Sequence, residues 1–281
     1  LQEQPADIVV VSCGATESAR LLLMSKSRLF PEGLGNRHDW VGRNLQGHVN
    51  TGATGNFPED VGTYDDIGPG VCISACDYNH GNPGLAGGGM LANEFIRLPI
   101  QFIDDLPRET PRWGQAHKNA MRRYYQHNIG VRGPTQEIPV WDARVQLDPV
   151  VTDHWGLPVV RLSGDKHPHT IEIGNHQAER AAEWLQETGA DFVEQRRAGP
   201  GLTGHQHQAG TCRMGSDLKT SVVDPWHRVH DMDNVFVVDA SVHVTNGGFN
   251  PVLTILALAF RAGEHIAMEW QAGGLRSGGM P

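Results

Sequence analysis

Apolar runs and turn residues near the start of the chain predict a strand followed by a helix. Residues 8–11 are all β-branched, as expected of a parallel strand that is buried on both faces. Gly14 ends this run, and Thr16 is expected to cap a helix that includes residues 19–24. The order strand, glycine turn, helix is a β-α unit, which can present a helix N-terminus to a ligand.

Alternating apolar and polar positions predict a β-hairpin in the second half of the chain. Residues 141–147 alternate in this way, as expected of a strand with one covered face, and residues 157–162 suggest its partner. The intervening residues 153–156 are expected to form the turn.

Helical spacing and a second β-branched run complete the pattern. Residues 168–187 predict a helix that ends at Gly189, and residues 235–239 predict another buried strand. The last long helix is expected over residues 251–270, with Pro251 in its first turn. Residues 192–206 are expected to be loop and a short strand.

The middle of the chain is glycine-rich and is expected to be irregular. Residues 50–137 contain several closely spaced glycines and prolines, which favour loops. The ends therefore indicate α/β structure and the middle indicates a sheet-rich insert.

Composition narrows the class of protein and of partner. With 281 residues and 39% hydrophobic content, the chain can form one large or two smaller globular domains and is expected to be soluble. Its net charge of −9 argues against nucleic acid or an anionic membrane as partner. The longest apolar run, 252–260, is far shorter than the ~20 residues that span a bilayer, and no leader is recognised. The compartment stays open between cytoplasm and periplasm.

The cysteines and paired histidines give little sign of a disulfide framework or a metal site. Cys13, Cys72, Cys76 and Cys212 include no C-x-x-C pair, and they are interpreted as unpaired thiols, although Cys72 and Cys76 could form a disulfide. The short pairs His205/His207 and His167/His169 lack a second ligand pair, so no metal is expected.

A self-sufficient dinucleotide-binding domain is not recognisable. Residues 199–204 match G-x-G-x-x-G, but no buried strand is expected before them and no helix after them, and Pro200 stiffens the turn. Another polypeptide segment must therefore supply a phosphate-binding loop if this chain uses a dinucleotide cofactor.

Several ordered motifs carry a family resemblance. They are His207-Gln-Ala-Gly-Thr-Cys-Arg-Met-Gly215, Ser221-Val-Val-Asp224, Asp239-Ala-Ser241 and Asn250-Pro-Val-Leu-Thr-Ile255, together with Val41-Gly-Arg-Asn-Leu-Gln-Gly-His48. In this order and spacing, the chain resembles the C-terminal part of the glucose-methanol-choline (GMC) family of FAD-dependent oxidoreductases. The resemblance covers residues 1–48 and about 150–270 well and the middle weakly.

The resemblance implies an α/β fold. It consists of the C-terminal part of a Rossmann-type FAD-binding domain, formed by residues 1–48 and 191–281, and an inserted α+β substrate domain on an antiparallel sheet, formed by residues 49–190. The family's G-x-G-x-x-G segment precedes the region covered by this chain. A missing N-terminal segment or a second chain is therefore expected as partner.

The resemblance also implies site residues. His207 corresponds to the base that takes the hydroxyl proton of an alcohol, a role that suits an imidazole titrating near ambient pH. Asn250 corresponds to the second catalytic position, where an amide can donate to the substrate oxygen. The residues expected to line the FAD cavity are Cys13, Gly14, Ala15, Asp239, Ala240, Asn250, Pro251 and Val252. Because Pro251 has no N–H, the donor to the reduced flavin must be a later residue of the helix.

The implied activity is oxidation of an alcohol group of a sugar or glycoside, with hydride passing to flavin N5. The segment 242–250 is most similar to bacterial sugar-oxidising members, including those that act at C3 of glycosides. Oxygen and another electron acceptor both remain open. The alternatives are a non-redox lyase that keeps FAD and a subunit that completes a partner flavoprotein.

Overall fold

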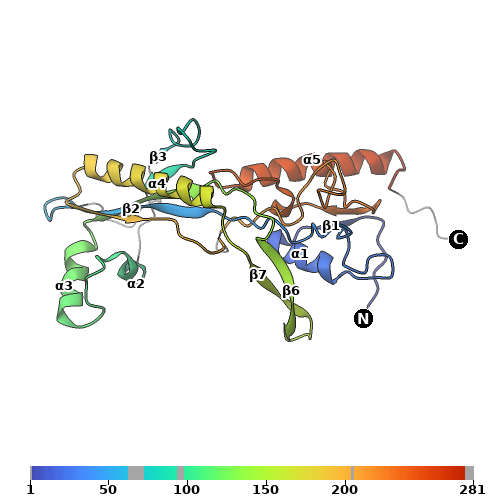
Figure 1. The fold of residues 1–281 in the computed structure, drawn as a ribbon, viewed down its shortest axis with the longest axis horizontal. Coiled ribbons are helices and arrows are strands. Elements are labelled where there is room, and N and C mark those ends of the chain that lie inside the picture. The colour runs from blue at the N-terminus through green and yellow to red at the C-terminus, as the bar shows by residue number, and fades with distance from the viewer. Residues whose placement is uncertain (1, 63–72, 94–97, 204–205, 276–281) are drawn as a thin grey trace. The chain divides into compact units, whose positions relative to one another are not determined.

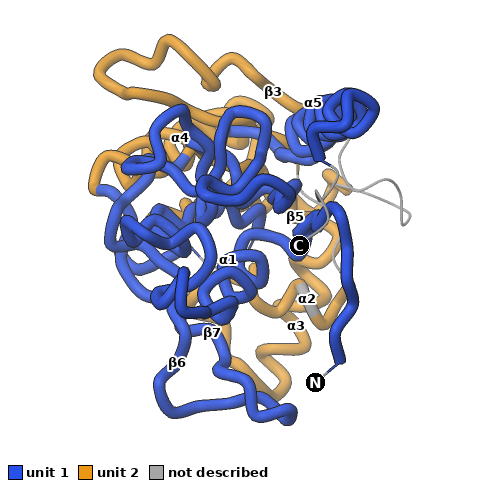
Figure 2. The backbone as a smooth tube through the Cα atoms, turned by 90° about the vertical axis from the view of Figure 1, so that its right-hand side faces the viewer, with its two compact units in different colours: residues 1–48, 137–167, 200–281 blue, residues 49–136, 168–199 orange. Residues whose placement is uncertain are grey.

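The computed structural model describes residues 2–62, 73–93, 98–203 and 206–275. The chain divides into two compact units (Figure 2). Unit 1 comprises residues 1–48, 137–167 and 200–281, and unit 2 comprises residues 49–136 and 168–199. Together they mix α and β structure and include an antiparallel sheet, which confirms the expected fold class at this level.

Unit 1 begins with the predicted β-α unit. Strand β1 (Val9–Val11) pairs in parallel with β9 (Val235–Val237), and helix α1 (Gly14–Met24) follows directly. Val9 and Val10 are nevertheless 41% and 52% exposed, so the expected burial on both faces is wrong. In the described part of the chain β1 has only β9 beside it, which leaves its other edge uncovered.

Helix α1 begins two residues before the expected cap. The structure begins the helix at Gly14, with Cys13 rather than Thr16 at the N-cap position. The Asp239 carboxylate accepts from the Gly14 N–H at 3.0 Å and thereby satisfies a donor at the helix start. A long-range contact that the local sequence does not show therefore sets this boundary.

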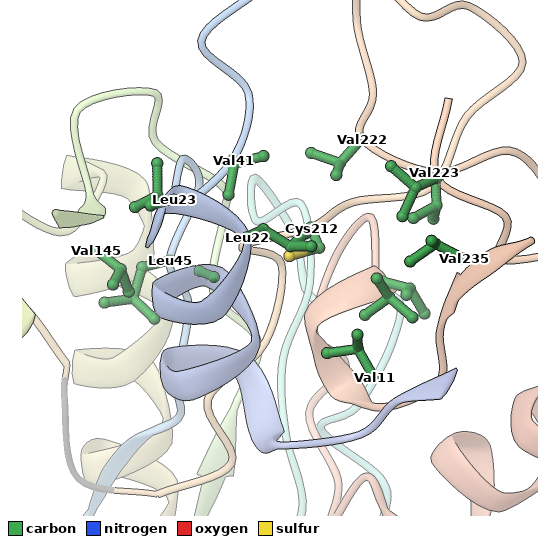
Figure 3. Packing of buried hydrophobic residues seen from close by; sticks show 14 residues of the cluster. Val11, Leu22, Leu23, Val41, Leu45, Val145, Cys212, Val222, Val223 and Val235 are labelled. Carbon is green, nitrogen blue, oxygen red and sulfur yellow. The ribbon is translucent and has the colours of Figure 1, made fainter. Parts of the chain in front are cut away.

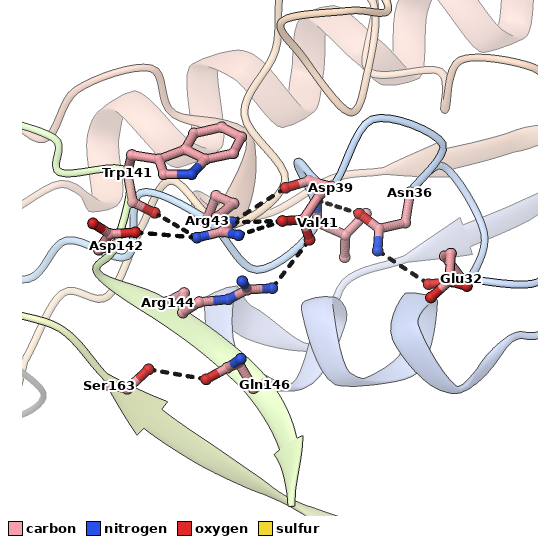
Figure 4. A network of polar contacts seen from close by, with 10 residues as sticks. All are labelled: Glu32, Asn36, Asp39, Val41, Arg43, Trp141, Asp142, Arg144, Gln146 and Ser163. Atoms are coloured by element: carbon pink, nitrogen blue, oxygen red, sulfur yellow. Dashed lines mark hydrogen bonds and ion pairs between the residues drawn. The ribbon is translucent and has the colours of Figure 1, made fainter.

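The predicted hairpin forms and packs on the segment that precedes unit 2. Its strands are β6 (Arg144–Thr152) and β7 (Pro158–Ser163), so the first strand starts later than expected. The Arg43 guanidinium lies 4.5 Å from the Trp141 ring centroid, and Arg144 bonds to Asp39 at 3.1 Å (Figure 4). Val145 N–H also donates to the Gly42 carbonyl at 2.8 Å, which completes the connection.

The core of unit 1 lies between α1, the β1–β9 pair and the hairpin. It gathers Leu22 and Leu23 of α1 with Val145, Cys212 and Val235 (Figure 3). The unit ends in η2 (Ala240–Val242) and the predicted long helix α5 (Val252–Gln271). No described helix combines the length and the apolar character needed to cross a bilayer.

Unit 2 is an antiparallel sheet with one long helix along it (Figure 1). The strand order is β3-β4-β5-β2-β8. The strands are β2 (Val49–Asn56), β3 (Ser74–Ala75), β4 (Leu91–Asn93), β5 (Asn128–Thr135) and β8 (Phe192–Arg196). The helices are α2 (Pro99–Phe102), η1 (Ile103–Asp105), α3 (Gly114–Tyr124) and α4 (Pro168–Glu187), of which α4 matches its predicted bounds.

The sheet agrees with the sheet-rich middle that the sequence indicates, although two of its strands, β2 and β5, lie in the glycine-rich part that was expected to be irregular. Strands β2 and β5 are eight residues each and pair over their whole length. Their glycines allow close approach, since a Cβ atom at Gly52 would lie 2.1 Å from the Val131 carbonyl oxygen. These strands are poor in the residues that usually mark strands, because their glycines serve backbone packing.

The compact units also differ from the expected continuous segments. Residues 137–167 pack with unit 1 through the hairpin contacts, and residues 191–199 belong to unit 2 because β8 pairs with β2. Unit 2 begins at residue 49.

Candidate active site

Two segments expected to line the cofactor cavity lie together in unit 1. The Asp239 carboxylate accepts from Gly14 N–H at 3.0 Å and from the Ser18 hydroxyl at 2.5 Å. The Ala15 carbonyl accepts from the Thr211 hydroxyl at 2.5 Å. The turn after β9, the start of α1 and the motif beginning at His207 therefore meet beyond the C-terminal ends of the parallel strands β1 and β9.

The 207–215 motif runs alongside the turn after β9. Cys212 N–H donates to the Ser241 carbonyl at 2.8 Å, and Gly210 N–H donates to Ala240 at 3.2 Å. The Cys212 thiol is fully buried, and burial raises its pKa to about 12. This thiol is therefore part of the packing and is no nucleophile at neutral pH.

His207 faces a second imidazole, that of His48. His207 Nδ1 lies 2.8 Å from His48 Nδ1, and the ring centroids are 4.9 Å apart with planes inclined by 76°. The backbone of His207 is in the left-handed region, with φ of 55°. This conformation costs free energy in any residue other than glycine. His207 Nε2 makes no hydrogen bond to a described residue.

The backbone beside His48 is held on several sides. Gln46 exchanges backbone hydrogen bonds with Ala209 at 3.0 and 2.9 Å. The Asn246 side-chain amide donates to the Gly47 carbonyl at 3.1 Å and to the His207 carbonyl at 2.8 Å. Asn246 thus joins the two segments that carry the histidines.

A buried carboxyl group completes this backbone framework. Glu137 is only 4% exposed, and its Oε2 accepts from Gly47 N–H at 2.7 Å. Burial raises the pKa of Glu137, and the Gly47 hydrogen bond partly opposes the rise.

Desolvation keeps both imidazoles neutral. Burial, followed by the neighbouring His207, lowers the pKa of His48 to about 4. Burial also lowers the pKa of His207, which is half-buried. A neutral imidazole can accept a proton, whereas an imidazolium cannot.

The structure places Asn250 at the surface of unit 1, before helix α5. Asn250 is exposed, and none of the hydrogen bonds among the described residues joins it to His207. Pro251 occupies the N-cap position without a side-chain cap, and Val252 starts the helix. The first N–H groups of α5 have no intrahelical partner and can donate to an acceptor.

Sequence reasoning missed His48, Asn246 and Glu137 as residues of this site. His48 is the last residue of the motif over residues 41–48, so the sequence contains a signal for this position. The sequence contains no signal that His48 contacts His207. Of the histidine pairs considered for a metal, His205 lies outside the described residues, as does Cys72 of the cysteine pair. Within the described ranges, no three metal-ligating side chains lie together.

Comparisons with known proteins agree on one class. Residues 139–259 match the family model described as GMC oxidoreductase. The chain is 32% identical to the 2-methyl-1,2-propanediol dehydrogenase of Mycolicibacterium austroafricanum over 94% of its own length and 48% of the relative's. It is also 32% identical to the 6'''-hydroxyparomomycin C oxidase of Streptomyces lividus, over 95% of its own length and 46% of that protein's. The chain thus spans about half the length of the curated relatives it matches.

A solved structure supports the fold. The formate oxidase of Aspergillus oryzae, from a study of FAD modification, gives a TM-score of 0.58 at 17% identity, covering 95% of this chain and 55% of that one. Fold and relatives together define an oxidoreductase scaffold. Residues 139–259 belong to the GMC oxidoreductase family, as its C-terminal domain, which confirms the resemblance in the sequence.

Proposed function

We propose that this chain is the substrate-oxidising half of an FAD-dependent alcohol oxidoreductase that acts on a sugar, glycoside or similar polyol. The observation that carries the proposal is the half-buried, neutral His207, whose Nε2 bonds to no described residue, in a motif of the GMC domain. The names of the two relatives are dehydrogenase and oxidase, which favours redox chemistry over the lyase alternative.

His207 would accept the hydroxyl proton as the carbon–hydrogen bond breaks. Its lowered pKa keeps the lone pair available, and its partial exposure leaves Nε2 accessible to a substrate. Asn250 would donate an amide hydrogen to the same oxygen, and its exposed position leaves room for this contact. Bound FAD would supply the electron acceptor, taking the hydride at N5.

The residues at the start of α1 fit a neutral part of FAD better than its diphosphate. Ser12, Cys13 and Gly14 are exposed, and a Cβ atom at Gly14 would meet nothing within 4 Å, so the turn leaves space for a group. The Asp239 carboxylate already neutralises the helix start, which disfavours a second anion there. The uncapped N-terminus of α5 suits negative charge, as expected near Val252 and Asn250.

Unit 1 would then be the C-terminal part of a Rossmann-type FAD domain, and unit 2 the inserted substrate domain. The parallel β1–β9 pair and the antiparallel sheet of unit 2 support this division. The adenine-binding part would come from a missing N-terminal segment or a second chain, since the chain spans about half of its relatives.

Anaerobic absorbance spectroscopy of the complete flavoprotein tests the proposal. A panel of sugars, glycosides and small diols is added, and we expect at least one compound to bleach the flavin band. His207→Ala should slow this reduction by about 10²–10⁴-fold. His38→Ala, at an exposed histidine of unit 1, should leave it unchanged.

Each other outcome has a definite meaning. A flavin that no alcohol in the panel bleaches would contradict the oxidoreductase function. Bleaching at the wild-type rate in His207→Ala would refute only the role of His207 as the base and would leave the oxidoreductase function standing.

A further inference from the structure

The contact between the two imidazoles has a consequence for the proton on His207. We propose that His48 is a positioning residue that keeps this proton on Nδ1 of His207, so that Nε2 presents its lone pair to the substrate hydroxyl. The proposal rests on the function proposed above. It assigns a role to a residue that would not itself touch the substrate.

The two ring nitrogens that face each other permit only two neutral arrangements. At 2.8 Å, one of the two Nδ1 atoms must carry a hydrogen and the other must accept it. If His48 donated, His207 would carry its proton on Nε2 and could accept nothing from a substrate. If His207 donates, its Nε2 is free to act as the base.

The role proposed for His207 as the base selects the second arrangement, because only then is its Nε2 unprotonated. His48 is 1% exposed, and its Nε2 has no hydrogen-bond partner among the described residues, so His207 is the partner that the ring contacts through Nδ1. A hydrogen on Nε2 of His48 leaves its Nδ1 as the acceptor.

The surrounding backbone keeps the two rings in this relation. Asn246 binds the carbonyl groups of both Gly47 and His207, and Glu137 binds the N–H of Gly47. His207 is also fixed in a left-handed backbone conformation. Such over-determined strain is typical of a side chain that must be aimed.

Two substitutions at His48 separate tautomer control from packing. His48→Leu replaces the imidazole, and with it the acceptor, by an apolar side chain. His48→Asn can place an amide oxygen near the position of Nδ1. His227→Leu removes another imidazole of unit 1 that is also 1% exposed and bonds through Nδ1 to Val237. It is the matched control for loss of a buried histidine.

The measurement is imidazole nitrogen NMR of the complete flavoprotein labelled with ¹⁵N-histidine, together with the rate of flavin reduction. In the wild type we expect His207 to be protonated on Nδ1 and unprotonated on Nε2. His48→Leu should move the proton to Nε2 and slow reduction by about 10²-fold. His48→Asn should restore both, and His227→Leu should leave the tautomer of His207 unchanged.

A His207 signal protonated on Nε2 in the wild type, or an unchanged tautomer in His48→Leu, would overturn the proposal. If the tautomer behaves as expected but no alcohol reduces the flavin, the positioning stands and the proposed function fails. The NMR signal thus separates the two failures.

Discussion

At the scale of single residues, burial of His48 ties the stability of the protein to pH. The pKa of His48 is about 4 in the folded chain and 6.5 in the unfolded chain, so the unfolded state binds more protons between these values. Stability should therefore fall as the pH decreases from about 6.5 to 4, by up to about 3 kcal/mol from this residue. Urea unfolding across this range measures the slope.

The comparison of wild type with His48→Asn isolates the contribution of this imidazole. His207, His227 and His243 also have lowered pKa values, because each is desolvated, and they contribute slopes of the same sign in both proteins. The variant should lose the part that belongs to His48 together with its coupling to His207. Equal slopes in the two proteins would show that His48 is not the buried neutral group described here.

The buried amide of Asn246 makes a separate prediction. Asn246→Ala removes both hydrogen bonds to the Gly47 and His207 carbonyls and leaves these acceptors without that donor. We expect a loss of roughly 1–3 kcal/mol in the free energy of unfolding. Asn119→Ala, at an exposed site in α3, should change it by less than about 0.5 kcal/mol. A similar small change at Asn246 would contradict its role in joining the two segments.

At the scale of elements, Gly42 determines how the β6–β7 hairpin packs in unit 1. It has φ of 85°, and a Cβ atom there would come within 2.2 Å of the Val145 carbonyl oxygen. Gly42→Ala must therefore displace β6 and should destabilise the protein by about 2–4 kcal/mol. Gly84→Ala, at a φ of 76° in open space, adds only backbone strain of about 1–2 kcal/mol. Equal losses in the two variants would show that the close approach to Val145 has no effect.

The elements also show what the sequence can and cannot predict. Helix α4 was predictable to its bounds because its apolar spacing and the glycine after it are local signals. Strands β2 and β5 were not, because their glycines and polar residues are selected by neighbouring strands. His207 could be found from its motif, whereas its pairing with His48 joins residues 159 positions apart.

At the scale of the whole molecule, helix α5 exposes several large apolar side chains. Among its described residues only Ala262 is buried, while Leu253 and Phe260 are 82% and 75% exposed. These two residues lie seven positions apart and so share one face of the helix. Exposed apolar faces of this kind favour contact with another segment or chain. Under the proposed function, that segment or chain would be the one that supplies the adenine site.

Phe260→Ser tests this contact by its different effects in two preparations. In the 281-residue chain alone, the substitution should leave stability within about 0.5 kcal/mol and reduce binding of an apolar dye, since nothing is unpacked. In the complete flavoprotein it should destabilise the assembly by about 2–4 kcal/mol and promote release of FAD, because a buried aromatic ring is lost. Val150→Ser, at an 83% exposed position on the hairpin, is the control and should have no effect in either preparation. If the complete Phe260→Ser protein keeps wild-type stability and flavin content, the α5 surface faces solvent. Under the proposed function, a different surface of unit 1 would then meet the adenine-binding part.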